Sequence, residues 1–165
     1  MAFRVVPQIG VLPWRLAPHG HHLEVLVISR RSGSGWTLPK GHTEPGRTLR
    51  EQAAIEAWEE AGIVRVRKSP MPEIGTLEMP RRGERLHIRM FLLQVDHLET
   101  QFPEAGQRRR RWVHPPELIT LLPRDWHSVI DHALPMIHEL VYEGGCDLAT
   151  VPFAASHAPY APRPA

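Results

Sequence analysis

The sequence predicts a single layered α/β domain. Short apolar segments bounded by turn residues surround one amphipathic helical segment, and a second helical segment closes the ordered part of the chain. The length of 165 residues is that of one domain, and the 42% of hydrophobic residues is enough to build an ordinary core. No internal repeat divides the chain.

Three strands are expected in the first third of the chain, over residues 8–16, 22–29 and 36–38. Their apolar and β-branched residues favour extended structure, most clearly in the second segment. The intervening segments are Pro18-His19-Gly20 and Ser32-Gly33-Ser34-Gly35, whose residues tolerate tight or left-handed backbone.

A helix is expected over residues 48–61. Thr48-Leu49-Arg50-Glu51 matches the capping-box pattern S/T-x-x-E at its start, and Gly62 suits the position after its end. Small or apolar side chains recur every four positions along this segment and predict a face that lies close against a sheet. They are Leu49, Ala53, Ala57 and Ala61.

The rest of the chain predicts more strands, a closing helix and a tail. Extended segments are expected over residues 63–68, 74–79 and 85–95, with a turn at 80–83 and a last strand ending at Trp112-Val113. Helical spacing of apolar residues predicts a helix over residues 125–142, kinked at Pro135. We therefore expect a folded domain over residues 1–143 and a loosely ordered, Pro- and Ala-rich tail over residues 144–165.

Composition argues against several classes of protein. Cys146 is the single cysteine, so an internal disulfide is excluded and a reducing compartment, the cytoplasm, is the expected location. No apolar run reaches about 18 residues, and residues 1–14 lack the order of a signal peptide, so we expect neither membrane insertion nor export. The net charge of +2 gives no support for a nucleic-acid partner.

Glu56, Glu59 and Glu60 place three carboxylates on one face of the predicted helix, at spacing i, i+3 and i+4. Like charges at this spacing each cost about 0.2–0.5 kcal/mol, and the helix dipole also disfavours negative charge in the last turns. A bound divalent cation would turn the same groups into ligands. The alternative is a solvated acidic face. For a Glu-x-x-Glu-Glu pattern taken alone, the solvated face is the more common interpretation. The alanine stripe directs the carboxylates away from the core toward residues 41–47, and the wider sequence context reverses that preference in favour of the metal site.

The stretch from Gly41 to Ile63 resembles the Nudix box, whose pattern is G-x5-E-x7-R-E-U-x-E-E-x-G-U. The preceding Trp36-Thr37-Leu38-Pro39-Lys40 also looks like the lead-in strand of that family, and Glu44 stands where a loop glutamate is common. A motif of this length and fixed spacing is far more specific than a lone glycine pattern. The resemblance implies the Nudix fold, a mixed β-sheet sandwiched between helices (α-β-α). The matching positions are Gly41, Glu56, Ala57, Glu59, Glu60, Gly62 and Ile63.

The resemblance implies a role for each of these groups. Glu56 and Glu60 would hold Mg²⁺ or Mn²⁺, and Glu59 would act as a ligand or as the base that activates water. The backbone carbonyl of Lys40 or Gly41 would complete the coordination. Few protein ligands and several waters suit Mg²⁺ beside a phosphate chain. From the roles that the resemblance implies, we expect Glu56 and Glu59 to be the catalytic residues.

Two positions depart from the pattern. Arg47 stands in place of the glutamate of G-x5-E, and Ile55 in place of the arginine before Glu56. The resemblance implies that the two family residues form an ion pair between loop and helix. Because both residues of that ion pair are replaced in this sequence, neither is left as a charged residue without its partner.

The arginine-rich segments suggest a highly phosphorylated substrate. The sequence also looks like the branch of diphosphoinositol-polyphosphate and diadenosine-polyphosphate phosphohydrolases. This resemblance is carried by the segment from Phe102-Pro103-Glu104 to Arg108-Arg109-Arg110-Arg111-Trp112, by Lys40-Gly41 and by the glutamate helix. We expect Arg31, Lys40, Arg89 and Arg110 to bind phosphate. A highly phosphorylated substrate needs several cations, and the planar fork of arginine matches two phosphate oxygens at once. In the run 108–111, strand alternation should direct Arg108 and Arg110 to one side and the other two arginines to the opposite side. The alternative for this run is a charged edge strand that resists aggregation.

Three functions follow as hypotheses. The leading one is a metal-dependent hydrolase that cleaves the phosphoanhydride bond of a nucleoside diphosphate linked to another moiety X, or of a related polyphosphorylated molecule. The others are a non-catalytic ligand sensor, suggested by Arg47 and Ile55, and an RNA-processing pyrophosphohydrolase, suggested by the arginine run. The resemblance also implies a homodimer as a candidate assembly. No histidine cluster has metal-ligand spacing, so His42, His87 and His114 are left outside the site.

Overall fold

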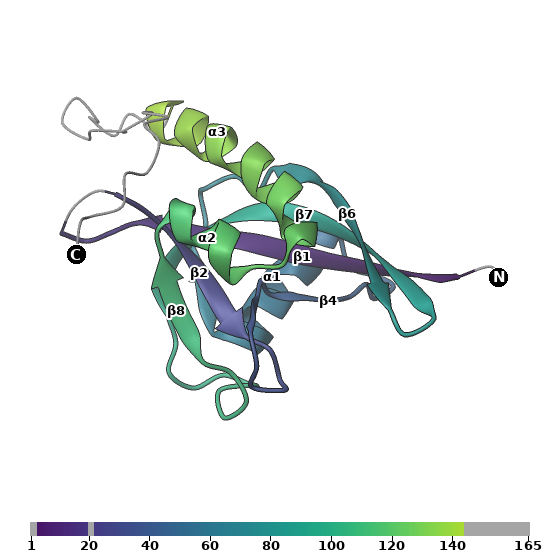
Figure 1. Cartoon of the computed structure of the whole chain (residues 1–165). Helices are drawn as coiled ribbons and strands as arrows, with labels where there is room; N and C mark the ends of the chain where they lie inside the picture. Colours follow the sequence, from purple (N-terminus) through teal and green to yellow (C-terminus); the bar gives the residue numbers. More distant parts are fainter. Residues whose placement is uncertain (1–2, 20–21, 144–165) are drawn as a thin grey trace, which may run out of the picture.

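The computed structural model describes residues 3–19 and 22–143 (Figure 1). The predicted tail, residues 144–165, lies outside the described residues. The strands are β1 (Arg4–Leu16), β2 (Leu23–Ser29), β3 (Trp36–Thr37), β4 (Lys40–His42), β5 (Ile63–Arg65), β6 (Glu73–Arg81), β7 (Glu84–Leu98) and β8 (Arg110–Val113). The helices are α1 (Leu49–Ala61), α2 (Pro115–Leu121) and α3 (His127–Glu143), with a short 3-10 turn, η1 (Arg124–Trp126), before α3.

The strands form a mixed sheet, as predicted. Its main path is β3-β2-β1-β7-β5, while β4 pairs with β1, β6 with β7 and β8 with β2. The pairing of β1 with β7 is parallel and runs from Arg4 beside Glu84 to Trp14 beside Gln94, whereas the other pairings are antiparallel. The two longest strands, β1 and β7, therefore form the centre of the molecule.

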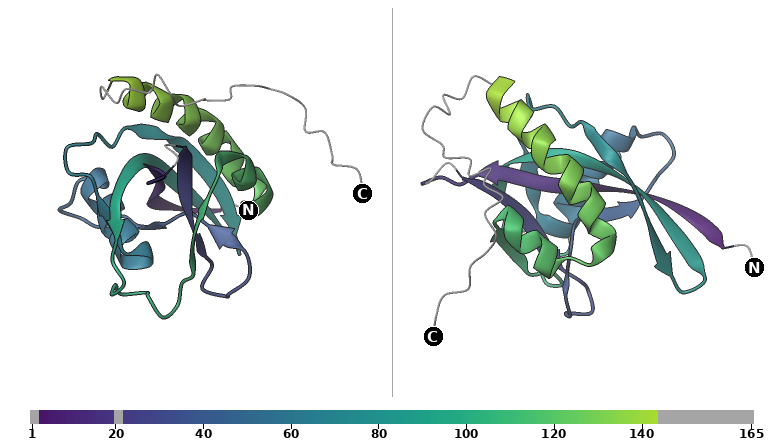
Figure 2. Two further views of the ribbon diagram at one scale, coloured as in Figure 1. Left: turned by 90° about the vertical axis from the view of Figure 1, so that its left-hand side faces the viewer. Right: turned by 45° about the horizontal axis from the view of Figure 1, so that its top comes forward.

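Helices cover both faces of the sheet, which confirms the predicted α-β-α layering (Figures 1 and 2). Ala53, Ala57 and Ala61 of α1 are fully buried in one core with Ile9, Val11 and Phe91, as their small side chains predict, and Leu49 is half-buried beside them. The other face of the same strands packs against α2 and α3 in a second core that includes Trp14 and Trp126. Within residues 3–19 and 22–143, no helix is long and apolar enough to cross a membrane.

The structure differs from the prediction in a few elements. Two short elements were not expected from the sequence: β4, which has three residues, and α2, which has seven and begins at a Pro-Pro pair. Element β5 ends at Arg65, three residues earlier than expected, whereas β6 continues to Arg81 into the expected turn. Helix α3 runs continuously across Pro135 to its end.

Both ends of α1 are fixed by local bonds. The Thr48 hydroxyl accepts the Glu51 N–H at 3.2 Å, and the Glu51 carboxylate accepts the Thr48 N–H at 2.8 Å, so the predicted capping box is confirmed. Gly62 has φ 64° and its N–H bonds the Trp58 carbonyl at 2.8 Å. A Cβ on Gly62 would lie 2.6 Å from Phe102. The chain after β7 is therefore packed tightly on the end of α1.

We predict that Gly62→Ala lowers the free energy of unfolding more than Gly46→Ala does. Both glycines have positive φ, 64° and 85°, so both variants incur the strain of about 1–2 kcal/mol of a left-handed alanine. Only Gly62 has neighbours in the way, since a Cβ on Gly46 meets nothing within 4 Å. Urea denaturation of the two variants measures the difference, and equal losses would contradict this packing.

Candidate active site

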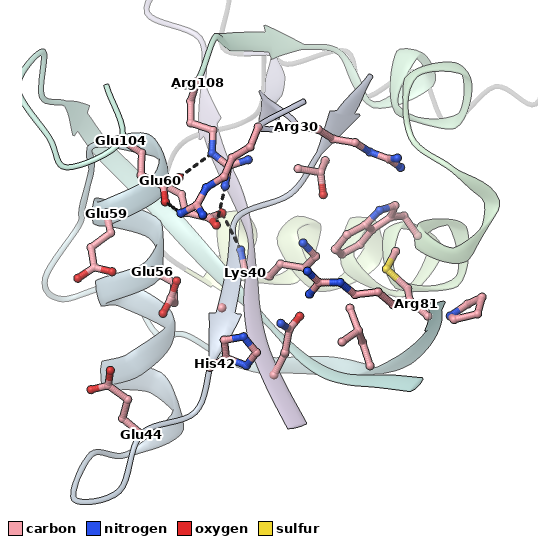
Figure 3. A pocket seen from close by; sticks show the side chains of 18 residues that line it. Arg30, Lys40, His42, Glu44, Glu56, Glu59, Glu60, Arg81, Glu104 and Arg108 are labelled. Atoms are coloured by element: carbon pink, nitrogen blue, oxygen red, sulfur yellow. Dashed lines mark hydrogen bonds and ion pairs between the residues drawn. The ribbon is translucent and has the colours of Figure 1, made fainter. Parts of the chain in front are cut away.

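A cavity of about 580 Å³ opens around β4, between α1 and the hairpin of β6 and β7 (Figure 3). In the pairing with β1, Ile9 lies opposite Gly41 and Gln8 lies opposite His42. Because successive strand residues face opposite sides, Gly41 faces α1, whereas Lys40 and His42 face away from it. The cavity therefore has two halves, one on each side of β4.

We call the side toward α1 the acidic half. Its carboxylates come from the predicted helix, from the loop after β4 and from the segment before β8 (Figure 3). The three glutamates of the helix motif all line this cavity. The full set is Glu44, Glu56, Glu59, Glu60 and Glu104.

Glu60 is the most deeply buried carboxylate of the helix motif, with 8% of the residue exposed. Its Oε2 accepts the Lys40 backbone N–H at 3.1 Å, and its Oε1 accepts Nη2 of Arg108 at 2.8 Å. Burial raises the pKa of Glu60 to about 7, because desolvation outweighs the stabilisation of the charged form by Arg108 and Lys40. The carboxylate is thus poised between its two protonation states near neutral pH.

Glu104 joins two arginines to this group. Its carboxylate accepts Nε of Arg108 at 2.7 Å and also bonds the guanidinium of Arg31. Burial alone would raise the pKa of Glu104, but the hydrogen bonds from Arg31 and Arg108 lower it overall. The sequence pointed to Arg108 only as one of four consecutive arginines and gave Glu104 no role in the site, because the meeting of these two residues depends on the fold.

Glu56 lies directly against the backbone of Gly41. A Cβ at Gly41 would collide with the Glu56 carboxylate, so glycine is required for this approach. Burial raises the pKa of Glu56, although a hydrogen bond of 3.1 Å from Gln52 opposes the shift. The carboxylate of Glu59 differs from both neighbours, because no side chain of residues 3–19 and 22–143 bonds it.

We call the opposite side of β4 the basic half. Lys40 and Arg81 extend toward each other there (Figure 3), and Arg30 also lines the cavity. Burial lowers the pKa of Lys40, and the positive charges of neighbouring arginines lower it further. His42, which the sequence analysis left outside the site, lines the cavity as well.

The acidic half fits a divalent cation by its donors. Its carboxylates offer oxygen, the donor type that Mg²⁺ and Mn²⁺ prefer, and the close contact of Gly41 with Glu56 brings backbone and carboxylate together. Within the described part of the chain, no three His, Cys, Asp or Glu side chains already converge in the geometry of a metal site. Binding would therefore require the carboxylates to draw closer.

Two of the predicted phosphate ligands do not line this cavity. Arg89 forms a bidentate pair with Glu73, with bonds of 2.8 and 2.7 Å. Arg110 donates to the carbonyls of Ala61 and Glu99 at 2.9 and 2.7 Å, so it closes the end of α1. Arg31 and Lys40, the other two, do line the cavity.

The run 108–111 alternates as strand geometry predicts. Arg108 and Arg110 bond groups of α1, whereas Arg109 donates to the Gly33 carbonyl and Arg111 pairs with Glu117. Each of these guanidinium groups is thus engaged within the protein. The run therefore stabilises the fold around the site and does not form a free basic surface.

Comparison with known proteins decides the family. The family model described as the NUDIX domain matches residues 7–135. The chain belongs to the Nudix family. Among curated Nudix proteins of Arabidopsis thaliana, Nudix hydrolase 21, chloroplastic, is 34% identical over 72% of the chain, and Nudix hydrolase 16, mitochondrial, is 33% identical over 65%. The matched segments span 60% and 62% of the length of these two relatives.

Solved structures show the same fold. A C. elegans Ap4A hydrolase binary complex has a TM-score of 0.65 at 20% identity, covering 81% of this chain and 98% of that one. The NUDIX domain of Shewanella oneidensis NrtR, complexed with ADP ribose, has a TM-score of 0.62 at 14% identity, covering 83% of this chain and 90% of that one. At such identities the likeness concerns the fold alone.

A polar relay connects Arg47, one of the two departures from the Nudix box, to Glu56 of α1. Arg47 donates to Glu44 at 2.8 Å and to Oε1 of Gln52 at 3.3 Å, and Nε2 of Gln52 donates to Glu56 at 3.1 Å. Gln52 is only 2% exposed. The loop and the helix thus remain tied, although the ion pair implied by the family pattern is absent.

We predict that Gln52→Leu weakens Mg²⁺ binding by about tenfold, since it removes the group that orients Glu56. Isothermal titration with Mg²⁺ measures the affinity. Adding Arg47→Glu and Ile55→Arg restores the ion pair of the family pattern and should recover most of the loss. An unchanged affinity in Gln52→Leu would show that the relay does not position Glu56.

The raised pKa of Glu60 predicts a pH dependence of stability. Because its folded pKa of about 7 exceeds the ordinary value of 4.5, the folded state holds the proton more tightly than the unfolded chain. The resulting stabilisation is complete below pH 4.5 and is lost as the pH rises through 7. In metal-free urea denaturation, the stability of Glu60→Gln relative to the unchanged protein should therefore rise over this range, by a few kcal/mol at most. A difference that is flat with pH would contradict the shift.

Proposed function

We propose that this protein is a divalent-metal-dependent pyrophosphohydrolase, which cleaves a phosphoanhydride bond in a nucleoside diphosphate linked to X or in a related polyphosphorylated molecule. The observation that carries the proposal is the cavity around β4. It combines a set of carboxylates for a cation on one side with unpaired positive charges for phosphate groups on the other. A diphosphate chain needs both.

The groups that would hold Mg²⁺ or Mn²⁺ are Glu56, Glu59, Glu60 and the backbone of Gly41. When bound, such a cation acidifies water and neutralises charge on a phosphate chain. Glu60 is tied to Arg108, and Glu56 is tied to Gln52, so both carboxylates are held in fixed directions.

Glu59 is the carboxylate that we assign as the base. It lines the cavity without a side-chain partner in the described residues, so its oxygens are open to accept a proton from water. Glu56 is the second candidate, since burial raises its pKa and thereby makes the carboxylate more basic. Arg31 and Lys40 would bind phosphate oxygens from the two sides of β4.

The names of the structural neighbours support this substrate class. One is an Ap4A hydrolase and another was solved with ADP ribose, and both of these compounds contain phosphoanhydride bonds. The RNA-processing alternative gains no support, because the arginine run is engaged in internal bonds. The sensor hypothesis rested on Arg47 and Ile55, and the relay through Gln52 weakens that reason.

Location and assembly are also inferred. A single cysteine in the whole sequence favours a reducing compartment, which is the cytoplasm in the simplest case. The names of the plant relatives place those proteins in chloroplasts and mitochondria. A homodimer is the assembly that the family resemblance implies, and sedimentation of the full chain tests it.

We predict that Glu59→Gln lowers the turnover of a phosphoanhydride substrate by about 100-fold or more, because the amide accepts no proton from water. The assay measures product release from diadenosine tetraphosphate, ADP-ribose and nucleotide sugars, with Mg²⁺, with Mn²⁺ and with chelator. Glu139→Gln, an exposed change on α3, is the matched control and should keep full activity. The absence of metal-dependent release from every substrate would refute the proposed function.

A further inference from the structure

Two histidines that are far apart in the sequence meet at one end of the pairing of β2 with β8. The ring centroids of His22 and His114 lie 4.7 Å apart, and the two rings are inclined by 50°. His22 immediately precedes β2, and His114 immediately follows β8, which lies beside β2 (Figure 1). Neither residue lines the cavity of the candidate active site. The fold therefore brings together a pair of imidazoles that spacing along the sequence did not reveal.

The register of the two strands explains this meeting. Val25 lies opposite Val113, so continuing the antiparallel pairing by one residue sets Glu24 beside His114 and places His22 at the diagonal position. Side chains two residues apart in a strand share a face, and diagonal neighbours reach each other when they are long or carry rings. The two imidazoles thus belong to one face of the sheet.

Backbone hydrogen bonds hold both histidines in position. The Ala17 N–H donates to the His22 carbonyl at 2.8 Å, which closes the turn between β1 and β2. The Glu117 carboxylate accepts the His114 N–H at 2.9 Å at the start of α2. Because the two backbone positions are already ordered, a ligand that binds both side chains pays little additional entropy.

The separation of the rings suits one shared metal ion. A histidine nitrogen lies about 2.0–2.1 Å from a bound Zn²⁺, so two imidazoles at a tetrahedral angle on one ion have ring centroids about 5 Å apart. The observed 4.7 Å is close to this value. The side chain of His22 is 49% exposed, and His114 is also exposed. An ion can therefore reach the pair from solvent.

The charged groups around the pair are balanced. Oε1 of Glu24 lies 3.8 Å from Nε2 of His22, while Oε2 of the same carboxylate accepts Nε of Arg15 at 2.8 Å. Arg111 likewise pairs with Glu117 at 3.0 Å. The positive charges of these two arginines are thus offset by carboxylates, and a cation that approaches the imidazoles meets no uncompensated repulsion from them.

We propose that His22 and His114 form a second metal site, which binds a divalent transition ion of the class of Zn²⁺, Ni²⁺ and Cu²⁺. Imidazole nitrogen suits these ions, whereas Mg²⁺ prefers the oxygen donors of the acidic half. In the part of the chain that the structure describes, no third His, Cys, Asp or Glu completes a ligand set, so water fills the remaining positions. The bound ion links the turn before β2 to the start of α2.

Titration calorimetry of the full chain with Zn²⁺, in an excess of Mg²⁺ that competes for the carboxylates, tests the site. His22→Ala and His114→Asn should each weaken Zn²⁺ binding by about tenfold or more, because each removes a ligand. His132→Ala is the matched control and should bind Zn²⁺ like the unchanged protein. His132 is exposed on α3 and bonds the Ser128 carbonyl of its own helix at 2.6 Å. Equal affinity in all four proteins would overturn the proposal.

The two variants also separate this pair from the other histidines of the turn. The sequence has His19 and His21 next to His22, so a turn that bound Zn²⁺ by itself would lose affinity in His22→Ala and keep it in His114→Asn. That result would contradict the shared site. Asparagine is a favoured residue at the start of a helix, so α2 should stay intact in His114→Asn, and the melting temperature without Zn²⁺ checks this.

A measurement on the unchanged protein needs no variant. Substoichiometric Cu²⁺, which is paramagnetic, should broaden the imidazole proton signals of His22 and His114 together and leave those of His132 sharp. Broadening of His22 without His114 would exclude a common ion.

The site should also be independent of catalysis. Because neither histidine lines the cavity, His22→Ala and His114→Asn should keep the Mg²⁺-dependent turnover of the unchanged protein. A parallel loss of Zn²⁺ affinity and of this turnover would show that the two histidines do not form a separate site.

Discussion

The buried guanidinium of Arg108 bonds three parts of the molecule that are far apart in the sequence. It donates to Glu60 on α1, to the Ser29 carbonyl at the end of β2 and to Glu104 in the segment before β8, at 2.8, 2.9 and 2.7 Å. Its side chain is only 7% exposed. Removing one partner of a buried pair costs about 3–5 kcal/mol. The position of Glu60, and with it the acidic half of the site, depends on this group.

The same arrangement explains how carboxylates and positively charged side chains line one cavity without all forming ion pairs with each other. On the α1 side, Arg31 and Arg108 are engaged by Glu104, and Glu60 is engaged by Arg108. On the other side of β4, the side chains of Lys40 and Arg81 have no carboxylate within ion-pair distance in the described residues. A strand of three residues separates the two environments, because its alternation turns Gly41 toward one and Lys40 toward the other. The carboxylates of α1 and the side chains of Lys40 and Arg81 therefore lie on different sides of one short element.

How far the sequence predicts this molecule depends on whether the signal is local. Helix α1 was predicted from its capping box, its alanine stripe and Gly62, all of which act within a few residues, and the carboxylates on its open face line the cavity as expected. Arg110 illustrates the limit. Four consecutive arginines carry no signal that distinguishes the one directed at the helix end from the one that bonds Glu60, since the register of β8 on β2 decides this. Gln8 and Glu104 were missed for the same reason, because they reach the cavity only when strands and loops that are distant in the sequence come together.

The parallel pairing of β1 with β7 has a consequence for the kinetics of folding. Arg4 pairs with Glu84, so the pairing of β1 with β7 closes a long loop of chain that includes α1. Closing so long a loop lowers the entropy of the chain before the contacts between the strands can compensate for the loss. Folds dominated by contacts between residues distant in the sequence therefore form slowly. A slip of one residue in this pairing would turn Gln8 toward α1 and Ile9 toward the phosphate side. The core and the lining of the cavity thus depend on the same register, and a misregistered chain would lose both together.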